Sequence, residues 1–254
     1  MPGAHPDVRI VTASWARIEP VRGGYDEAAL DALQHAVRSV RSEGGEPVVV
    51  LHAGALPDWV IARHGWLDPD IGADWGCYVD RVAQRVAAHV RWWAPLRGPL
   101  EEAHWYEEGA RVVLRALLDA HAAAYLHLKR TQGFGGRPPE VGTLATWATW
   151  SGEGLRGHVE ARMRARLGPD AWVSVLASGR LAPPFSLVGE LPNGTAALDW
   201  IGVDWAGSVE LPSGRVLGPD EAGRAACVAR LAAYGKPMLM PGAGALPGVR
   251  RVGE

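Results

Sequence analysis

The chain has 254 residues, of which 48% are hydrophobic and 21% are charged, and its formal net charge is −2. This length suits one large domain with a sizeable core, or two small ones, and the composition is that of an ordinary globular protein. Because the net charge is small and the arginines are scattered, we expect no general affinity for nucleic acid or for anionic membranes.

The N-terminal sequence and the two cysteines bear on the cellular compartment. The first residues, MPGAHPDVRI, lack the apolar region of a signal peptide, and no apolar run is long enough to span a membrane. Cys77 and Cys227 are far apart and lack metal-ligand spacing, so we expect two buried, reduced cysteines. These features predict a cytoplasmic protein.

Short apolar segments alternate with segments of helical periodicity along the chain. The first apolar segment, VRIVTASW, is followed by DEAALDALQHAVRSVRSEGG, whose final glycines are typical of a helix end. The expected strands are residues 8–15, 46–54, 90–96, 141–150, 196–205 and 236–242. The expected helices are residues 26–45, 74–90, 107–132, 152–168 and 218–235.

This repeat predicts an α/β fold with about six parallel strands covered by helices. A complete (β/α)₈ TIM barrel has eight strands, so a barrel of this kind would be incomplete or modified. No linker divides the chain, and we expect a single domain over residues 1–254. The segment GFGGRPPE at 133–140 follows a helix and lacks phosphate-loop spacing, so we interpret it as a turn.

Six motifs along the chain occur in the order found in one known family. The motifs are SWARIEP (14–20), EPVVVLHAGALPDWV (46–60), GWLDPD (65–70), VRWWAPLRGPLEEA (90–103), LDWIGVDW (198–205) and KPMLMPGAG (236–244). In order and spacing the sequence resembles the family 1 glycoside hydrolases, which are β-glucosidase-like TIM barrels. The resemblance extends from about residue 9 to residue 244.

The resemblance also implies that two barrel strands are absent. SWARIEP matches the end of the family's second strand, and the residues before Asp7 hold no counterpart of the first strand. The final segment, ALPGVRRVGE, is too short for the eighth strand and its sugar-binding residues. Because such a gap would expose two strand edges, we expect a loop, a terminal segment or a second chain to cover it.

The resemblance implies that the sugar-cleaving groups are gone. A retaining glycosidase uses two carboxylates about 5–5.5 Å apart. Gly98 occupies the position of the family's acid/base Glu, and Gly242 that of its nucleophile. Ile10 and Ala53 stand where the family has an Arg and a sugar-binding His. We therefore expect no glycoside hydrolysis by the family mechanism, and a roomier, more apolar pocket.

Three charged or titratable residues at strand ends are the candidate catalytic residues, because TIM barrels carry their sites there. His52 is either a proton donor and acceptor or a core histidine. Arg97 either anchors a carboxylate or carbonyl, or forms an ion pair with Glu101, Glu102 or Asp204. Asp204, an acid within an apolar strand, is expected to be paired or to have a raised pKa.

Several aromatic residues and one acid are the candidate ligand contacts. Trp15 also belongs to a motif with Glu19 that suggests a structural role, and many of the 12 tryptophans will be core residues. The acids at 101, 102, 107 and 108 are typical of a solvated helix start. The candidate contacts are Trp15, Trp59, Trp147, Trp150, Trp205, Met240 and Glu102.

Two functions remain open on these grounds. The sequence has no zinc, dinucleotide or P-loop motif, so we expect neither a metal nor a cofactor. One hypothesis is a cofactor-free biosynthetic cyclase, isomerase, dehydratase or lyase acting on a small, partly hydrophobic molecule. The other is a non-catalytic metabolite- or carbohydrate-binding protein, or an accessory subunit. Convergence of His52, Arg97 and Asp204 on one pocket would favour the enzyme, and separate ion pairs would favour the binding protein.

Overall fold

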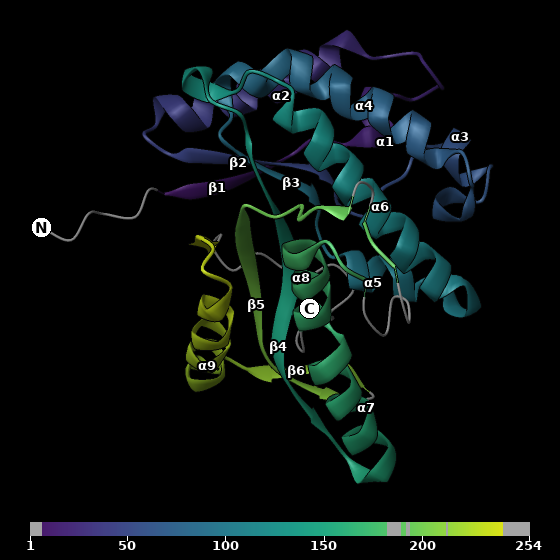
Figure 1. Cartoon of the computed structure of the whole chain (residues 1–254), viewed down its shortest axis with the longest axis vertical. Helices are drawn as coiled ribbons and strands as arrows, with labels where there is room; N and C mark the ends of the chain where they lie inside the picture. The colour runs from purple at the N-terminus through teal and green to yellow at the C-terminus, as the bar shows by residue number, and fades with distance from the viewer. Residues whose placement is uncertain (1–6, 182–188, 192–193, 212, 241–254) are drawn as a thin grey trace, which may run out of the picture.

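Six parallel strands form the central sheet of the computed structural model, which describes residues 7–181, 189–191, 194–211 and 213–240 (Figure 1). Each strand overlaps one of the six predicted segments, which confirms the α/β barrel-like fold. The strands are β1 (Val8–Thr12), β2 (Glu46–His52), β3 (Trp92–Leu96), β4 (Glu140–Gly152), β5 (Trp200–Leu211) and β7 (Met238–Leu239).

Strands that follow one another in sequence also pair in the sheet, in the order β1-β2-β3-β4-β5, and β7 pairs with β5. The last pairing is short, joining Ile201 to Met238 and Gly202 to Leu239. Within the residues that the structure describes, no strand pairs with the outer edge of β1 or of β7. The barrel is therefore not closed by hydrogen bonds, as expected for an incomplete barrel.

β5 continues well beyond its predicted end at Trp205. It turns back through an antiparallel pairing with β6 (Arg215–Gly218), which the sequence analysis did not predict. Residues 208–211 alternate between partly buried and buried, and this period of two is the signal of a half-buried strand. The first strand, by contrast, stops early, because α1 (Trp15–Ile18) begins within its predicted range.

Six longer helices cover one face of the sheet. In Figure 1, α2, α4 and α6 lie across the first three strands, α7 and α8 lie over β4, and α9 lies beside β5. The sequence analysis missed α8, where Pro169 at the first position starts a new helix directly after Gly168. The helices are α2 (Glu27–Ser42), α4 (Ile71–Val86), α6 (Ala110–Lys129), α7 (Gly154–Leu167), α8 (Pro169–Ser178) and α9 (Glu221–Leu231).

Shorter helical segments connect these elements. Two of them, α3 (Asp58–Ile61) and α5 (Pro99–His104), follow the ends of β2 and β3. The segment at 133–140 contains a single 3₁₀ turn, in agreement with its interpretation as a turn. In the described part of the chain, 3₁₀ turns lie at Gly65–Leu67, Ala87–His89, Glu107–Gly109, Phe134–Gly136 and Ala232–Tyr234.

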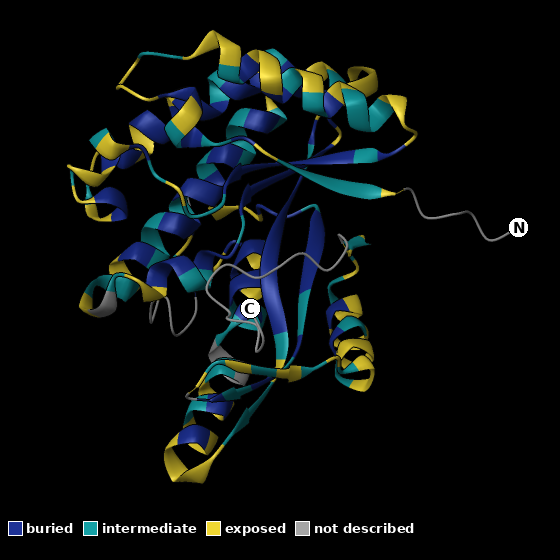
Figure 2. Cartoon of the chain, turned by 180° about the vertical axis from the view of Figure 1, so that it is seen from behind, coloured by how far each residue is buried: buried dark blue, intermediate teal, exposed yellow. Residues whose placement is uncertain are grey.

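Two apolar clusters pack against the two faces of the sheet. The larger cluster, which we call the outer layer, lies between the strands and the helices. The smaller cluster, which we call the barrel interior, lies on the face away from the helices, and the strands between the two are largely buried (Figure 2). The barrel interior consists of Val48, Val50, Trp92, Ala94, Leu144 and Trp200.

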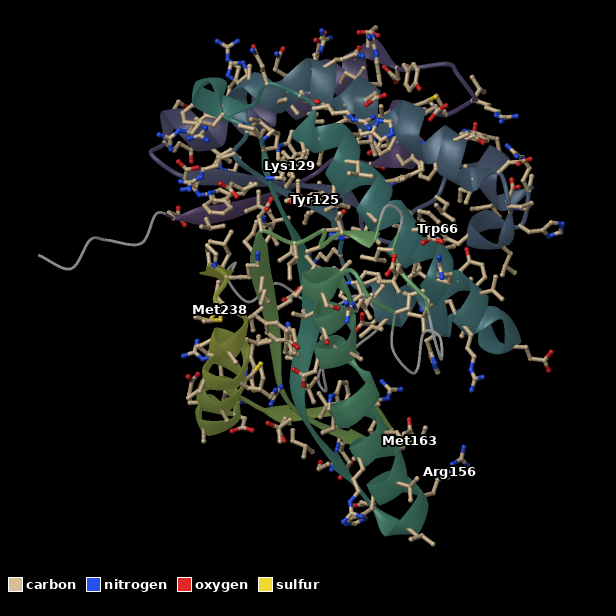
Figure 3. The ribbon with its side chains drawn as sticks, in the orientation of Figure 1. Trp66, Tyr125, Lys129, Arg156, Met163 and Met238 are labelled. Carbon is tan, nitrogen blue, oxygen red and sulfur yellow. The ribbon has the colours of Figure 1, made fainter. Side chains whose placement is uncertain are left out.

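Polar contacts connect α6 to the residues at the beginning of β5. Lys129 Nζ lies 2.6 Å from an oxygen of Asp199, and the Tyr125 hydroxyl donates to the same carboxylate at 3.1 Å (Figure 3). One turn earlier, the fully buried His121 is bonded through Nε2 to the carbonyl of Ala197 at 2.9 Å. Burial lowers the pKa of His121 to about 4, so its ring is neutral and donates this hydrogen bond at neutral pH.

Both cysteines are free, but only one of them is buried. Cys227 lies in the outer layer, and burial raises its pKa to about 11. Cys77 is exposed on α4, so the prediction that both are buried is wrong for Cys77. No helix within the described residues is long and apolar enough to cross a membrane.

Candidate functional site

The turn after β3 sits where the carboxyl ends of three strands meet. The backbone N–H of Arg97 donates to the carbonyl of His52 at 2.9 Å, and that of Gly98 donates to Leu144 at 3.1 Å. These bonds fix the turn between β2 and β4. Gly98 has a φ of 65°, a left-handed conformation that suits glycine, and Pro99 then starts α5.

Arg97 and Asp204 form an ion pair at this end of the barrel. Nε and Nη2 of Arg97 donate to the same oxygen, Oδ2 of Asp204, at 3.0 and 2.6 Å. Asp204 is only 4% exposed. It follows Trp200 by four residues on β5, so strand alternation places it on the face of the barrel interior. We call this place the barrel mouth.

The ion pair leaves hydrogen-bonding capacity unused. Among the described residues, neither Nη1 of Arg97 nor Oδ1 of Asp204 has a hydrogen-bond partner. A guanidinium held in this way presents fixed donors to a carboxylate or carbonyl group. The pair can therefore bind a polar group of a small molecule without being broken.

Glu101 is a third charged residue at the barrel mouth, and the sequence analysis took it for a solvated residue. Its Oε2 is buried without a hydrogen-bond partner among the described residues. Burial raises the pKa of this carboxyl, and hydrogen bonds from its own backbone and from Thr146 oppose the rise. Its position directly after a turn at a strand end is the signal that could have identified it.

His52 lies elsewhere, on the helix side of the sheet. Its Nε2 is 2.8 Å from both oxygens of Glu102, and the indole N–H of Trp66 donates to the same carboxylate at 2.6 Å. The His52 ring contacts Trp66 and Trp75 edge-on, and its side chain is fully buried. The next residue, Ala53, packs against the barrel interior instead.

Glu102 is therefore enclosed rather than solvated. It is 3% exposed, and its carboxylate is surrounded by His52 and Trp66, the latter labelled in Figure 3. The interpretation of Glu102 as part of a solvated helix start is wrong. In this arrangement its oxygens bind residues of the protein itself, which is the behaviour of a buried structural acid.

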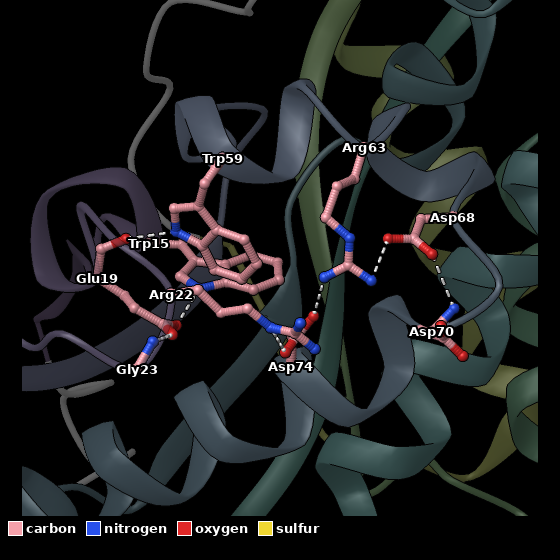
Figure 4. A network of polar contacts seen from close by, with 9 residues as sticks. All are labelled: Trp15, Glu19, Arg22, Gly23, Trp59, Arg63, Asp68, Asp70 and Asp74. Carbon is pink, nitrogen blue, oxygen red and sulfur yellow. Dashed lines mark hydrogen bonds and ion pairs between the residues drawn. The ribbon is translucent and has the colours of Figure 1, made fainter.

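Trp15 and Trp59 belong to a second structural network in the outer layer (Figure 4). The indole of Trp15 donates to Oε2 of Glu19 at 2.8 Å, and that of Trp59 donates to the Glu19 carbonyl at 2.9 Å. The other oxygen of Glu19 accepts the backbone N–H of Gly23. Trp15 is fully buried and stacked on Tyr78, which matches the structural alternative for this motif.

Three other predicted ligand contacts line one shared cleft. Trp147, Trp150 and Trp205 border a cleft of about 360 Å³ between the two long strands and the helices α8 and α9. Trp147 and Trp205 pair in register one position after Thr146 and Asp204, so they lie on the opposite face of the sheet from the barrel mouth. The three tryptophans thus line one cleft, but the sheet separates this cleft from Arg97.

Of the predicted catalytic residues, the structure brings Arg97 and Asp204 together and places His52 apart. Met240, predicted as a ligand contact, follows β7 and is 50% exposed. Gly242, at the nucleophile position, lies outside the described residues. Among the described residues, no cluster of three His, Cys, Asp or Glu side chains could hold a metal ion.

Comparison with known proteins defines the class of fold. No family model matches the chain. The β-glycosidase from Pyrococcus horikoshii shares the fold with a TM-score of 0.74 and 19% identity, over 91% of this chain and 60% of that chain. A β-glucosidase from Exiguobacterium marinum gives a TM-score of 0.74 at 15% identity, over 92% of this chain and 63% of that one. The chain therefore has a β-glycosidase-like barrel fold.

Two further similarities are also to β-glucosidases. The family 1 β-glucosidase from Thermotoga maritima matches with a TM-score of 0.72 and 16% identity, over 92% of this chain and 62% of that chain. Beta-glucosidase 40 from Arabidopsis thaliana is 33% identical over 88 residues, which are 34% of this chain and 17% of that protein. The chain spans only about 60% of the length of the structural neighbours.

Proposed function

We propose that this chain binds a small organic molecule at the barrel mouth and converts it without a cofactor, and that it does not hydrolyse glycosides. The observation that carries the proposal is the Arg97–Asp204 ion pair beside Gly98. A glycosidase-like barrel here presents a fixed guanidinium one residue before Gly98, which stands where the resemblance expects a proton-donating Glu. Such a site favours a carbonyl or carboxylate compound over a sugar.

The apolar lining of the barrel interior supports the same substrate class. Ile10 and Ala53, at positions where the resemblance expects an Arg and a sugar-binding His, both pack against the barrel interior. A sugar needs hydrogen-bonding partners for its hydroxyl groups, and leaving them unpaired costs binding energy. The proposed substrate is therefore partly hydrophobic, and the reaction would be an isomerisation, cyclisation, dehydration or other lyase step.

A non-catalytic binding protein is the second candidate, and a specific observation favours it. The side chains of His52 and Arg97 bind two different acids, Glu102 and Asp204, instead of converging on one pocket. With His52 engaged by Glu102, proton transfer depends on the acids of the barrel mouth. A protein that binds benzoate or a related compound but catalyses no proton transfer would fit this candidate.

Two measurements test the proposal. With 4-nitrophenyl β-glucoside as the substrate, we expect no release of nitrophenol above the buffer control. With benzoate as a planar carboxylate probe, we expect an increase in the melting temperature of the wild-type protein.

A pair of variants locates that binding. Arg97→Met should abolish the increase, because the guanidinium that binds the carboxylate is gone. Arg230→Met is the matched control, because Arg230 is an ion-paired arginine at the cleft between α8 and α9. Equal loss in both variants, or in neither, would contradict binding at the barrel mouth.

The proposal also concerns the two strand edges at which the barrel is open. We infer that the chain folds as one domain and that a second chain covers the edges of β1 and β7, since unpaired strand edges are normally paired or covered. Analytical ultracentrifugation tests the partner. A monodisperse monomer that binds benzoate normally would refute the need for a second chain.

A further inference from the structure

Glu101 lies beside the space that the missing side chain of Gly98 would fill. Its Oε2 is 3.3 Å from the point where a Cβ on residue 98 would stand. Gly98 takes a left-handed φ of 65°, Pro99 starts α5, and Glu101 stands in the first turn of that helix. The short helix α5 thus places a carboxyl group near the strand end at which Gly98 itself has no side chain.

The surroundings of Glu101 come from three other elements of the fold. Thr146 on β4 and Arg164 on α7 favour the ionised carboxyl and lower its pKa, whereas Asp204 on β5 adds a negative charge nearby. Burial is the largest of these influences and favours the protonated form. Oε2 is buried and unpartnered among the described residues, so no protein group occupies its lone pairs.

We propose that Glu101 is the proton-transferring carboxyl of the barrel mouth, acting on a small molecule that has an acidic C–H next to a carbonyl group. This inference rests on the proposed function and adds the acid–base group that His52 does not supply. In the ionised state, Oε2 takes the proton from carbon. The C–H electron pair forms a carbon–carbon double bond, and the carbonyl electrons move to oxygen, where Nη1 of Arg97 donates a hydrogen bond.

The same carboxyl then completes the reaction. From a β,γ-unsaturated carbonyl compound the first step gives a dienolate, and Glu101 returns its proton to the γ carbon, which gives the conjugated isomer. From a β-hydroxy carbonyl compound the enolate expels hydroxide from the β carbon as Glu101 protonates it, which gives water and the α,β-unsaturated carbonyl compound. Either route restores the ionised carboxylate and balances all atoms and charges. No oxidant, metal or cofactor takes part in these steps.

The ring opening of 5-nitrobenzisoxazole is a suitable probe. A base removes the proton from the ring carbon, the N–O bond breaks, and a coloured cyanonitrophenolate forms. Wild-type protein should accelerate this reaction more than free acetate at equal concentration, with a rate that rises with pH through a pKa above that of an ordinary Glu. Glu101→Gln should lower kcat/KM at least tenfold, because its amide cannot accept the proton.

Glu108→Gln is the matched control, because Glu108 is an exposed acid a few residues further along the chain. Equal rates for Glu101→Gln and the wild type, or a wild-type rate no higher than that of acetate, would overturn the inference. If benzoate binding still depends on Arg97 in that case, the proposed function survives. A pH titration of ¹³C-labelled Glu side chains adds a test without turnover: a resonance missing in Glu101→Gln should titrate above the ordinary range, and its absence would also overturn the inference.

Discussion

The buried hydrogen-bonded pair His52–Glu102 and the ion pair Arg97–Asp204 come from neighbouring strand ends but lie in different surroundings. The backbone N–H of Arg97 binds the carbonyl of His52, yet the side chains point to opposite faces of the sheet. The first pair is enclosed by Trp66 and Trp75 in the outer layer. The second faces the barrel interior and keeps polar atoms without a partner among the described residues.

This contrast separates a structural pair from a binding pair. A carboxylate whose oxygens are fully engaged inside the protein contributes to folding and offers nothing to a ligand. A pair that uses one carboxylate oxygen and leaves a guanidinium nitrogen free can hold a ligand with little rearrangement. Stability should therefore depend on the outer layer, and function on the barrel mouth.

The largest effect is expected from Glu102→Ala. Removing one partner of a buried pair leaves His52 and the indole of Trp66 without their acceptor, which should reduce the free energy of unfolding by about 3–5 kcal/mol. Urea denaturation measures this loss. Glu108→Ala, at an exposed acid, should change stability by less than about 0.5 kcal/mol. A similarly small change for Glu102→Ala would show that the enclosed pair is not structural.

The next effect is a dependence of stability on pH that comes from His121. Burial lowers the pKa of His121 to about 4 in the folded state, whereas an unfolded His titrates near its ordinary value of about 6.5. Between these values the unfolded chain binds a proton that the folded chain does not. Stability should therefore fall by about 3 kcal/mol as the pH decreases from about 6.5 to about 4.

A variant that lacks only His121 isolates the contribution of this residue to the pH dependence of stability. His121→Gln keeps a donor for the carbonyl of Ala197 and should flatten the stability curve over this pH range. His35→Gln, at an exposed histidine on α2, should leave the slope unchanged. An unchanged slope in His121→Gln would contradict the assignment of a neutral, buried ring to His121.

The smallest effect is expected from Gly98→Ala. A side chain at a left-handed φ of 65° costs about 1 kcal/mol, and the new Cβ would also lie 3.3 Å from Oε2 of Glu101. Gly44→Ala has a comparable φ of 81° and nothing within 4 Å of its Cβ, so it should carry only the backbone cost. Gly98→Ala should also slow the ring opening of 5-nitrobenzisoxazole, whereas Gly44→Ala should not.

The sequence predicted the strands well because periodicity and glycine-marked helix ends are local signals. Each of the six parallel strands overlaps its predicted segment. The elements that were missed depend on context: α8 follows α7 with only Gly168 between them, and the β5–β6 hairpin extends a strand whose predicted end was set by Trp205. Their local markers, Gly168-Pro169 and the period of two over residues 208–211, are short.

The partners of the charged residues were much harder to predict. Sequence spacing allowed Arg97 to pair with Glu101, Glu102 or Asp204, and only the register of β4 against β5 turns Asp204 toward it. Glu101 and Glu102 are adjacent on one short helix and therefore point to different regions of the protein. The same applies to His52 and Ala53, of which only Ala53 packs against the barrel interior. Which residue faces a site is thus decided by tertiary packing.

The position of a bound probe tests the central claim most directly. We expect a crystal structure of the protein with benzoate to show the carboxylate hydrogen-bonded to Nη1 of Arg97, on the side of the barrel interior. Benzoate bound only in the cleft between α8 and α9, against Trp147 and Trp205, would contradict the assignment of the barrel mouth as the functional site.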